Sequence, residues 1–99
     1  MFEVYVIAEA AKEYDRLAGN EKQWVDAAIQ KLKERGEGIG EPLGNTKYAR
    51  LQTYKKVKHR KLGLRMIFRE EKQQTNVITV IAIGKRTDEK IYKDAHKRL

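Results

Sequence analysis

The chain of 99 residues contains no cysteine and only one proline. Without cysteine it can form no disulfide framework, no thiolate metal site and no cysteine nucleophile, and it fits a reducing compartment. No apolar run reaches the length of a transmembrane helix, and the first residues lack the basic start of a signal peptide. We therefore expect a cytoplasmic protein with no membrane segment.

Length and periodicity indicate a single domain over residues 1–99. A chain of this size can bury a modest core without disulfides or metal ions. Charged residues make up 36% of the sequence, yet the apolar residues are regularly spaced, which favours a packed fold over disorder. Phe2, Val4 and Val6 alternate with other residues and predict a first strand over residues 2–7.

The spacing of apolar residues changes at Ala8 and predicts two helices that meet at Gly19 and Asn20. Gly19 is a typical end signal for the first helix, and Asn20 followed by Gln23 resembles a capping box for the second. The two helices together indicate a helical hairpin. Their predicted apolar stripes are Ala10, Tyr14 and Leu17, and then Trp24, Val25, Ala28, Ile29 and Leu32.

The second half of the chain predicts a sheet. A glycine-rich loop over residues 36–44 precedes three strands, at about 54–60, 64–69 and 77–83, whose short turns imply antiparallel pairing. A short closing helix begins near Asp88 and places Ile91, Ala95 and Leu99 on one face. The expected fold class is α+β: an antiparallel sheet with an N-terminal helical hairpin packed on one side, in the order β-α-α-β-β-β plus a short C-terminal helix.

Positive charge is concentrated in one stretch of the chain. Of 22 basic and 14 acidic residues, nine basic and no acidic ones lie between Lys47 and Arg69. The rest of the chain carries 13 basic and 14 acidic residues, so this stretch accounts for the net charge of +8. A local cationic field attracts polyanions and raises their association rate, which favours a nucleic-acid partner.

Strand parity predicts which of these cations act together. Lys56, Lys58 and Arg60 share one face of their strand. In the next strand Leu64, Met66 and Phe68 form the core set, which leaves Arg65, Ile67 and Arg69 on the other face. Pairing of the two strands would bring Lys56, Lys58 and Arg65 to one patch of the sheet, and His59 would point away from it.

Three segments carry a family resemblance. The run Tyr54 to Phe68 (YKKVKHRKLGLRMIF), the segment Ile81 to Arg86 (IAIGKR) and Tyr92 resemble the RelE toxins of the RelE/ParE superfamily. The resemblance implies a RelE-like fold over residues 1–99 and a ribosome-dependent endoribonuclease, an mRNA interferase that cuts messenger RNA in the A site. It also implies a cognate antitoxin as partner, along with the ribosome and messenger RNA, and no metal or small-molecule cofactor.

The resemblance also assigns site residues. It implies that the catalytic set is Lys56, Lys58, Arg65, Arg86 and Tyr92. Further RNA-binding candidates in and beside the cationic stretch are Arg50, Lys55, Arg60, Lys61, Arg69 and Lys85. The His and Glu that some other ribonuclease branches use have no clear counterpart in the sequence.

These residue types suit cleavage of RNA without a metal ion. Such a reaction needs a base for the 2′-hydroxyl, charge stabilisation at the phosphate and a proton for the departing 5′-oxygen. For Tyr92 to act as the base near pH 7, its ordinary pKa of about 10 must fall by roughly 3 units, or about 4 kcal/mol, which neighbouring cations can supply. Lys56 or Lys58 would donate the proton, and Arg65 and Arg86 would bind the scissile phosphate.

Other interpretations remain open for the same residues. The cationic stretch could be a solvated face, Arg65 could form a structural salt bridge, and Tyr92 could cover the core with its hydroxyl in water. Two other functions also fit the charge: a non-catalytic module that binds RNA or the ribosome, and a ParE-like gyrase poison.

Overall fold

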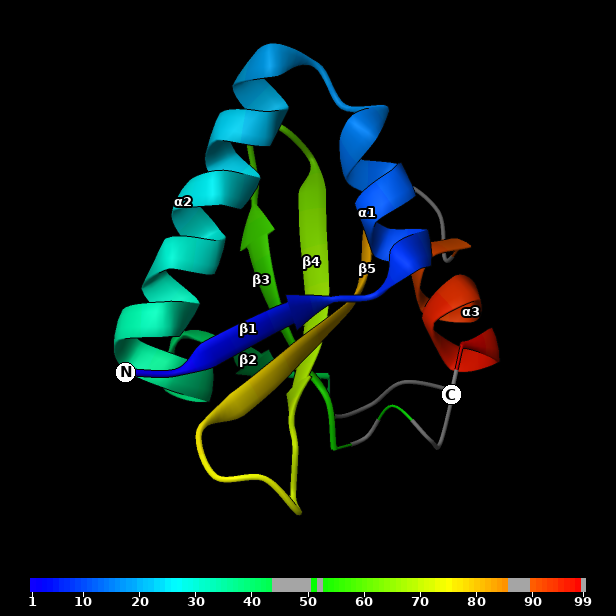
Figure 1. The fold of residues 1–99 in the computed structure, drawn as a ribbon. Helices are drawn as coiled ribbons and strands as arrows, with labels where there is room; N and C mark the ends of the chain where they lie inside the picture. Colours follow the sequence, from blue (N-terminus) through cyan, green and yellow to red (C-terminus); the bar gives the residue numbers. More distant parts are fainter. Residues whose placement is uncertain (44–50, 52, 86–89, 99) are drawn as a thin grey trace.

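The computed structural model describes residues 1–43, 51, 53–85 and 90–98. The elements follow in the order β1 (Glu3–Val6), α1 (Ala8–Asp15), α2 (Gly19–Arg35), the 3-10 helix η1 (Gly36–Ile39), β2 (Glu41–Pro42), β3 (Lys55–His59), β4 (Leu64–Glu70), β5 (Val77–Lys85) and α3 (Lys90–Lys97). The strands form one sheet in the order β1-β5-β4-β3-β2 (Figure 1). This architecture confirms the predicted α+β class. No helix among the described residues is long and apolar enough to cross a membrane.

The sheet is mixed. β3, β4 and β5 pair antiparallel, as the short turns between them predict. β1 instead pairs with β5 in parallel, with Glu3 opposite Val77 and Val6 opposite Val80. Turn length could not predict this pairing, because most of the chain separates the two strands.

The segment predicted as a glycine-rich loop contains regular structure. After α2 the chain forms η1 and then β2, which pairs antiparallel with the start of β3. Pro42 is tolerated because β2 is an edge strand. Gly36 ends α2 with φ of 74°, and an added Cβ would lie 2.3 Å from the Phe2 ring. The Leu43 N–H after β2 donates to the Tyr54 carbonyl at 3.1 Å, and Gly44, the last residue of the predicted loop, lies outside the described residues.

The helical hairpin covers one face of the sheet, as predicted (Figure 1). Val25 and Leu32 of α2 are fully buried against Met66 and Phe68 of β4. The predicted stripes of both helices are confirmed, with Ala10, Val25, Ala28 and Leu32 buried and Tyr14, Leu17, Trp24 and Ile29 packed beside them.

The start of α2 differs from the expectation. The helix begins at Gly19, and its first backbone N–H groups follow an Ala18 N-cap that has no side-chain acceptor. The Glu21 carboxylate accepts a hydrogen bond of 2.9 Å from the Ala18 N–H, which supplies half of a capping box. Glu21 therefore does what the sequence assigned to Gln23, and Gly19 starts α2 rather than ending α1.

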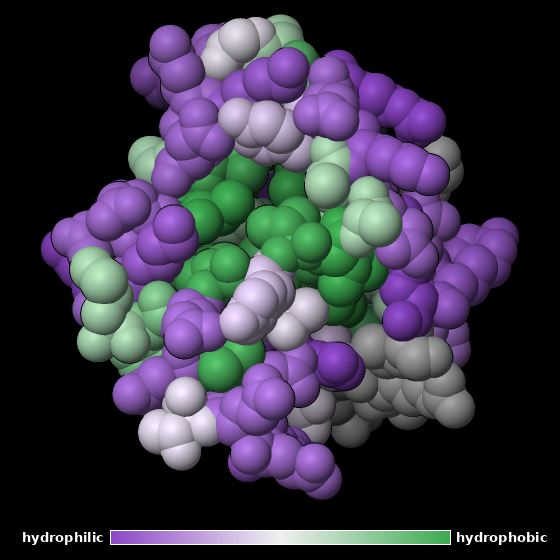
Figure 2. All heavy atoms as spheres, in the orientation of Figure 1, coloured by the Kyte–Doolittle hydropathy of each residue, from purple (hydrophilic) through white to green (hydrophobic). Residues whose placement is uncertain are grey.

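An apolar hollow lies between the two helices. α1 and α2 are joined at one end and diverge from it (Figure 1). Figure 2 shows apolar side chains gathered in the space between them, bordered by polar ones. The core between the helical hairpin and the sheet is bordered by half-buried apolar residues, which include Val6, Ile7, Tyr14, Leu17, Trp24 and Ile29.

The opposite face of the sheet carries a second, smaller core beneath α3. Ile91 and Ala95 of α3 are buried against Ile67 and Ala82 of the sheet. Their spacing of four residues places them on one face of the helix, as predicted. Asp88 and Leu99, which were predicted to cap and extend this helix, lie outside the described residues.

A clamp of charged residues fixes the end of α3. β1 stops at Val6, so among the described residues no strand lies beside the second half of β5 on that edge. The Ile83 N–H donates to the Glu13 carboxylate of α1 at 3.0 Å. The Arg98 guanidinium donates to Glu13 and to the Ile81 carbonyl, each at 2.8 Å. These bonds satisfy an otherwise open strand edge and tie α3 to α1 and β5.

Candidate active site

The register of β3 and β4 brings three cations together. Lys58 lies directly opposite Arg65, and Lys56 lies opposite Ile67. Residues opposite one another in an antiparallel pair point to the same side of the sheet, and so do residues two apart in one strand. Lys56, Lys58 and Arg65 therefore share one side, and we refer to these three residues as the cationic face. All three are half-buried.

Tyr92 lies beside the cationic face. The Arg65 Cζ atom is 5.5 Å from the centroid of the Tyr92 ring, within the range of a cation–π contact. The position follows from helix docking, because the neighbouring Ile91 is buried in the core beneath α3 and leaves Tyr92 half-buried at its margin. Three of the four predicted catalytic cations and the predicted tyrosine are thus assembled from β3, β4 and α3.

The cationic face carries an electrostatic cost. Burial lowers the pKa of Lys56, and the positive charges of Arg65 and Lys58 lower it further. The negative charge of Glu41 acts in the opposite direction. Like charges are therefore held close together here, an arrangement that proteins tend to keep at functional sites.

We expect Lys56→Gln to stabilise the fold at neutral pH. Because the pKa of Lys56 is lower in the folded chain than its ordinary 10.5, its charge opposes folding wherever the folded side chain is protonated. Removing the charge should raise Tm by about 2 °C, the equivalent of roughly 0.5 kcal/mol. The folded lysine loses its proton first as pH rises, so this gain should shrink as pH approaches the ordinary lysine pKa.

Thermal unfolding of both proteins over a pH series measures this difference. Lys61→Gln is the matched control, because Lys61 is exposed in the turn after β3. If Tm rises equally in the two variants, or if the rise grows with pH, the repulsion among the charges of the cationic face does not destabilise the fold.

Sequence reasoning missed an acidic residue at this site. Glu41 of β2 lies opposite Lys56, and its Oε2 atom is 3.5 Å from the Lys58 Nζ atom. The Glu41 side chain is 57% exposed, so it borders the cationic face without being enclosed by it. A strand of two residues leaves no alternation to detect, and only the pairing with β3 reveals which side Glu41 occupies.

Two of the predicted RNA-binding cations lie on the other side of the sheet. Lys55 forms an ion pair with the Glu37 carboxylate and packs on the side that the helical hairpin covers, since it lies opposite Phe68. Lys85 forms an ion pair with Glu21 of α2. These two lysines are therefore separated from the cationic face.

The remaining predicted cations fall into three groups. Arg60 and Lys61 are exposed in the turn beyond Lys58, at the end of the β3–β4 hairpin. Arg69 is on the same side of β4 as Arg65 and Ile67, where it is bound to Glu71 and Tyr54. Arg50 and Arg86 lie outside the described residues.

His59 points away from Lys58, as strand parity predicts. Its ring packs edge-on against Trp24 at 5.9 Å between centroids. Its Nδ1 atom accepts a hydrogen bond of 3.1 Å from the Leu62 N–H. The histidine therefore supports the β3–β4 turn.

This architecture is similar to that of solved protein structures. No model of a known protein family matches the sequence, and no curated protein matches it. Among solved structures, a free mutant of the Escherichia coli toxin RelE with two arginines replaced by alanine matches with a TM-score of 0.76 and 21% identity. That match covers 99% of this chain and 97% of the other. The chain has the RelE fold.

Two further structures with the RelE fold are toxin–antitoxin complexes. The intact E. coli RelBE complex matches with a TM-score of 0.68 and 19% identity, over 86% of this chain and 96% of the other. The RelBE2 complex of Mycobacterium tuberculosis matches with a TM-score of 0.61 and 13% identity, over 86% and 98%. At these identities the likeness establishes the fold alone.

Proposed function

We propose that this chain is the toxin of a type II toxin–antitoxin system and acts as a metal-independent endoribonuclease on ribosome-bound messenger RNA. The observation that carries the proposal is the register that sets Lys58 opposite Arg65, with Lys56 on the same side and Tyr92 against Arg65. Glu41 borders this face, but a merely solvated face would not hold three half-buried cations together against a tyrosine.

The proposed reaction is transfer of the phosphate to the neighbouring ribose oxygen. The 2′-oxygen attacks phosphorus, the bond from phosphorus to the 5′-oxygen breaks, and the products carry a 2′,3′-cyclic phosphate and a 5′-hydroxyl. Tyr92 accepts the proton of the 2′-hydroxyl, and Lys56 or Lys58 donates a proton to the 5′-oxygen. Arg65, joined by Arg86, binds the non-bridging oxygens as their charge develops.

The arrangement favours these roles electrostatically. A guanidinium beside a phenol favours the phenolate form, which is the form that accepts a proton. The lowered pKa of Lys56 makes that side chain a better proton donor than an ordinary lysine. The same cations can supply the charge stabilisation that a metal ion provides in other nucleases.

The Glu41 carboxylate is an alternative to the Tyr92 phenol as the base that accepts the proton of the 2′-hydroxyl. One variant distinguishes these two candidates. If Tyr92 is the base, Glu41 only repels the phosphate. Glu41→Gln should then bind RNA about threefold more tightly, because removing a like charge about 6 Å away in water is worth roughly 0.7 kcal/mol. Cleavage should be retained.

The measurement is titration of an uncleavable 2′-deoxy analogue of the RNA, followed by a cleavage assay. Glu37→Gln is the control, since Glu37 contacts Lys55 on the other side of the sheet. Loss of cleavage by orders of magnitude in Glu41→Gln would transfer the role of base from Tyr92 to Glu41.

The proposed partners are an antitoxin and the ribosome. Two of the similar solved structures are toxin–antitoxin complexes, and the apolar hollow between α1 and α2 offers a surface that a small protein could cover (Figure 2). The ribosome would orient the messenger against the cationic face. We expect a small neighbouring gene product to bind this chain and restore growth.

Induction of the isolated chain followed by mapping of messenger ends tests the proposed function. If the chain is a ribosome-dependent nuclease, new messenger RNA ends should appear at fixed positions within codons. They should appear only in messages that ribosomes are translating. Stalled translation with intact messages would instead indicate a non-catalytic binder. DNA breaks with a supercoiling defect would indicate a gyrase poison.

A further inference from the structure

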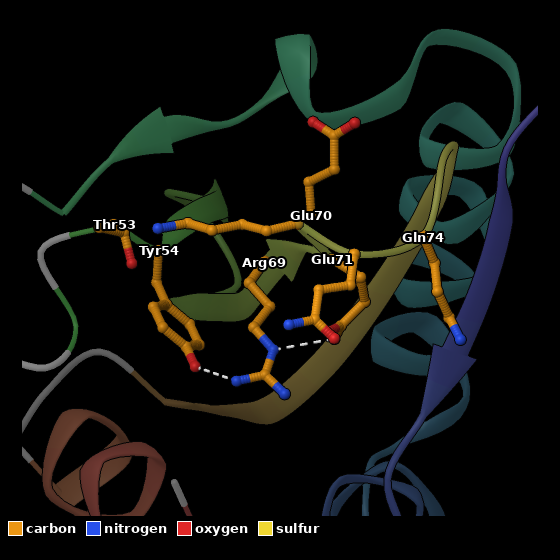
Figure 3. A pocket seen from close by; sticks show the side chains of 8 residues that line it. Thr53, Tyr54, Arg69, Glu70, Glu71 and Gln74 are labelled. Carbon is orange, nitrogen blue, oxygen red and sulfur yellow. Dashed lines mark hydrogen bonds and ion pairs between the residues drawn. The ribbon is translucent and has the colours of Figure 1, made fainter.

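A cleft opens at the end of the sheet where β4 turns toward β5, beside Tyr54 and Arg69, which point to the side that carries the cationic face. Its volume is about 600 Å³, within the range of small-molecule sites. Figure 3 shows Tyr54 and Arg69 side by side in its lining, joined by a hydrogen bond. A smaller hollow of about 460 Å³ adjoins it and shares Thr53, Arg69 and Gln74. The lining of the larger cleft is Thr53, Tyr54, Arg69, Glu70, Glu71, Lys72, Gln73 and Gln74.

The strands place this cleft in line with the cationic face. Lys55 lies opposite Phe68, so Tyr54 and Arg69 extend the same pairing by one row. The successive rows on this side of β3 and β4 begin with Lys58 opposite Arg65 and end with Tyr54 beside Arg69. Arg65 and Arg69 are four residues apart, or about 13 Å along the strand. Ile67, between them on this side, is buried beneath α3, so a short run of extended nucleotides that spans this distance would pass on the β3 side, by Lys56.

The charges of the cleft differ from those of the cationic face. Arg69 and Lys72 are balanced by Glu70 and Glu71, so the lining has no net charge. Two carboxylates would repel a second phosphate. Threonine and glutamine side chains, which also line the cleft, present donors and acceptors of the kind that match the edge of a nucleobase.

Arg69 is held in place before any ligand arrives. Its Nε atom donates to the Glu71 carboxylate at 2.9 Å, and its Nη1 atom donates to the Tyr54 hydroxyl. The Arg69 Cζ atom also lies 5.5 Å from the Tyr54 ring centroid. The Thr79 hydroxyl donates to Glu71 at 2.7 Å, and this bond together with Arg69 lowers the pKa of Glu71. A guanidinium fixed in this way loses little freedom on binding and offers a planar surface for a base.

We infer that this cleft binds the base of a nucleotide in the RNA strand whose scissile phosphate lies on the cationic face. The cleft would then read base identity while the cationic face performs the chemistry. The inference rests on the proposed function in one respect, namely that RNA is the ligand of the cationic face.

Binding of short single-stranded RNA oligomers to the purified chain tests this inference independently of cleavage. The oligomers carry 2′-O-methyl ribose so that the 2′-oxygen cannot attack and they cannot be cut. Each oligomer lacks the base at a different single position. Removal of one particular base should weaken binding about tenfold, which corresponds to about 1.4 kcal/mol, because the contacts of that base with the cleft are lost. Removal of the bases at other positions should have smaller effects.

A variant of the cleft completes the test. Thr53→Ala/Gln74→Ala removes two polar side chains of the lining without changing charge, and Gln23→Ala on the exposed face of α2 is the control. The double variant should show a clearly smaller effect of the missing base, because only the Arg69 surface and Gln73 remain to contact it, and the control should keep the full effect. Equal binding of every oligomer, or unchanged sensitivity in the double variant, would overturn the inference. Intact messages in the induction experiment would instead contradict the proposed nuclease activity. Base binding by the cleft would then still be decided by the oligomer titrations alone.

Discussion

Tyr92→Phe should reduce messenger cleavage by about a thousandfold while leaving the fold and RNA binding intact. The substitution removes only the hydroxyl, so the ring keeps its place beside Arg65. General base catalysis contributes typically 10² to 10⁴ in rate, which sets the expected loss. Single-turnover cleavage of a ribosome-bound message measures the rate, and titration of an uncleavable RNA analogue measures binding.

Tyr5→Phe is the matched control for this experiment. Tyr5 is 55% exposed on β1, and its hydroxyl donates to Glu3. Removal of that hydroxyl should change neither the rate nor the affinity. If Tyr92→Phe cuts RNA at nearly the normal rate, the tyrosine has no chemical part in the reaction and serves only to cover the core.

Arg65→Lys should slow cleavage by about a hundredfold although it preserves the charge. Arginine presents a planar fork that can bind two phosphate oxygens at once, whereas lysine offers a single point of charge. Loss of one donor aimed at developing charge typically costs 10² to 10³ in rate. Lysine also lacks the planar guanidinium whose Cζ atom lies 5.5 Å from the Tyr92 ring centroid. Rate and affinity should be measured as for Tyr92, and the rate should fall more than the affinity.

Arg60→Lys provides the comparison for Arg65, since Arg60 is exposed in the turn at the end of β3. It should cleave at close to the normal rate. If Arg65→Lys were equally active, Arg65 would contribute charge alone, and a fork at that position would not be needed.

Strand parity made the cationic face predictable from the sequence. Apolar Leu64, Met66 and Phe68 had to face the main core, which placed Arg65 on the opposite side. The period of two in the preceding strand then placed Lys56 and Lys58 with it once the strands paired. These inferences needed only local alternation and a short turn, and the observed register agrees with them.

Features that depend on distant pairing were not predictable in the same way. Glu41 belongs to a strand of two residues, and its approach to Lys58 follows from pairing with β3 across an intervening segment of chain. Lys55 counts as a cation in the sequence, yet Glu37 of η1 neutralises it on the other side of the sheet. Arg98 looks like a helix-terminal charge, but Glu13 of α1 binds it. In each case the oppositely charged partner is remote in sequence. A count of charges along the chain therefore does not show which cations are neutralised by an ion pair.

The end groups of the cut messenger test the central claim most directly. Attack by the 2′-oxygen on a phosphate held by the cationic face must leave a 2′,3′-cyclic phosphate on one fragment and a 5′-hydroxyl on the other. Fragments produced by the purified chain on translating ribosomes should carry these ends, and Tyr92→Phe should yield few of them. Fragments ending in a 3′-hydroxyl and a 5′-phosphate would mean that water, not the ribose, attacks phosphorus, and would contradict the account.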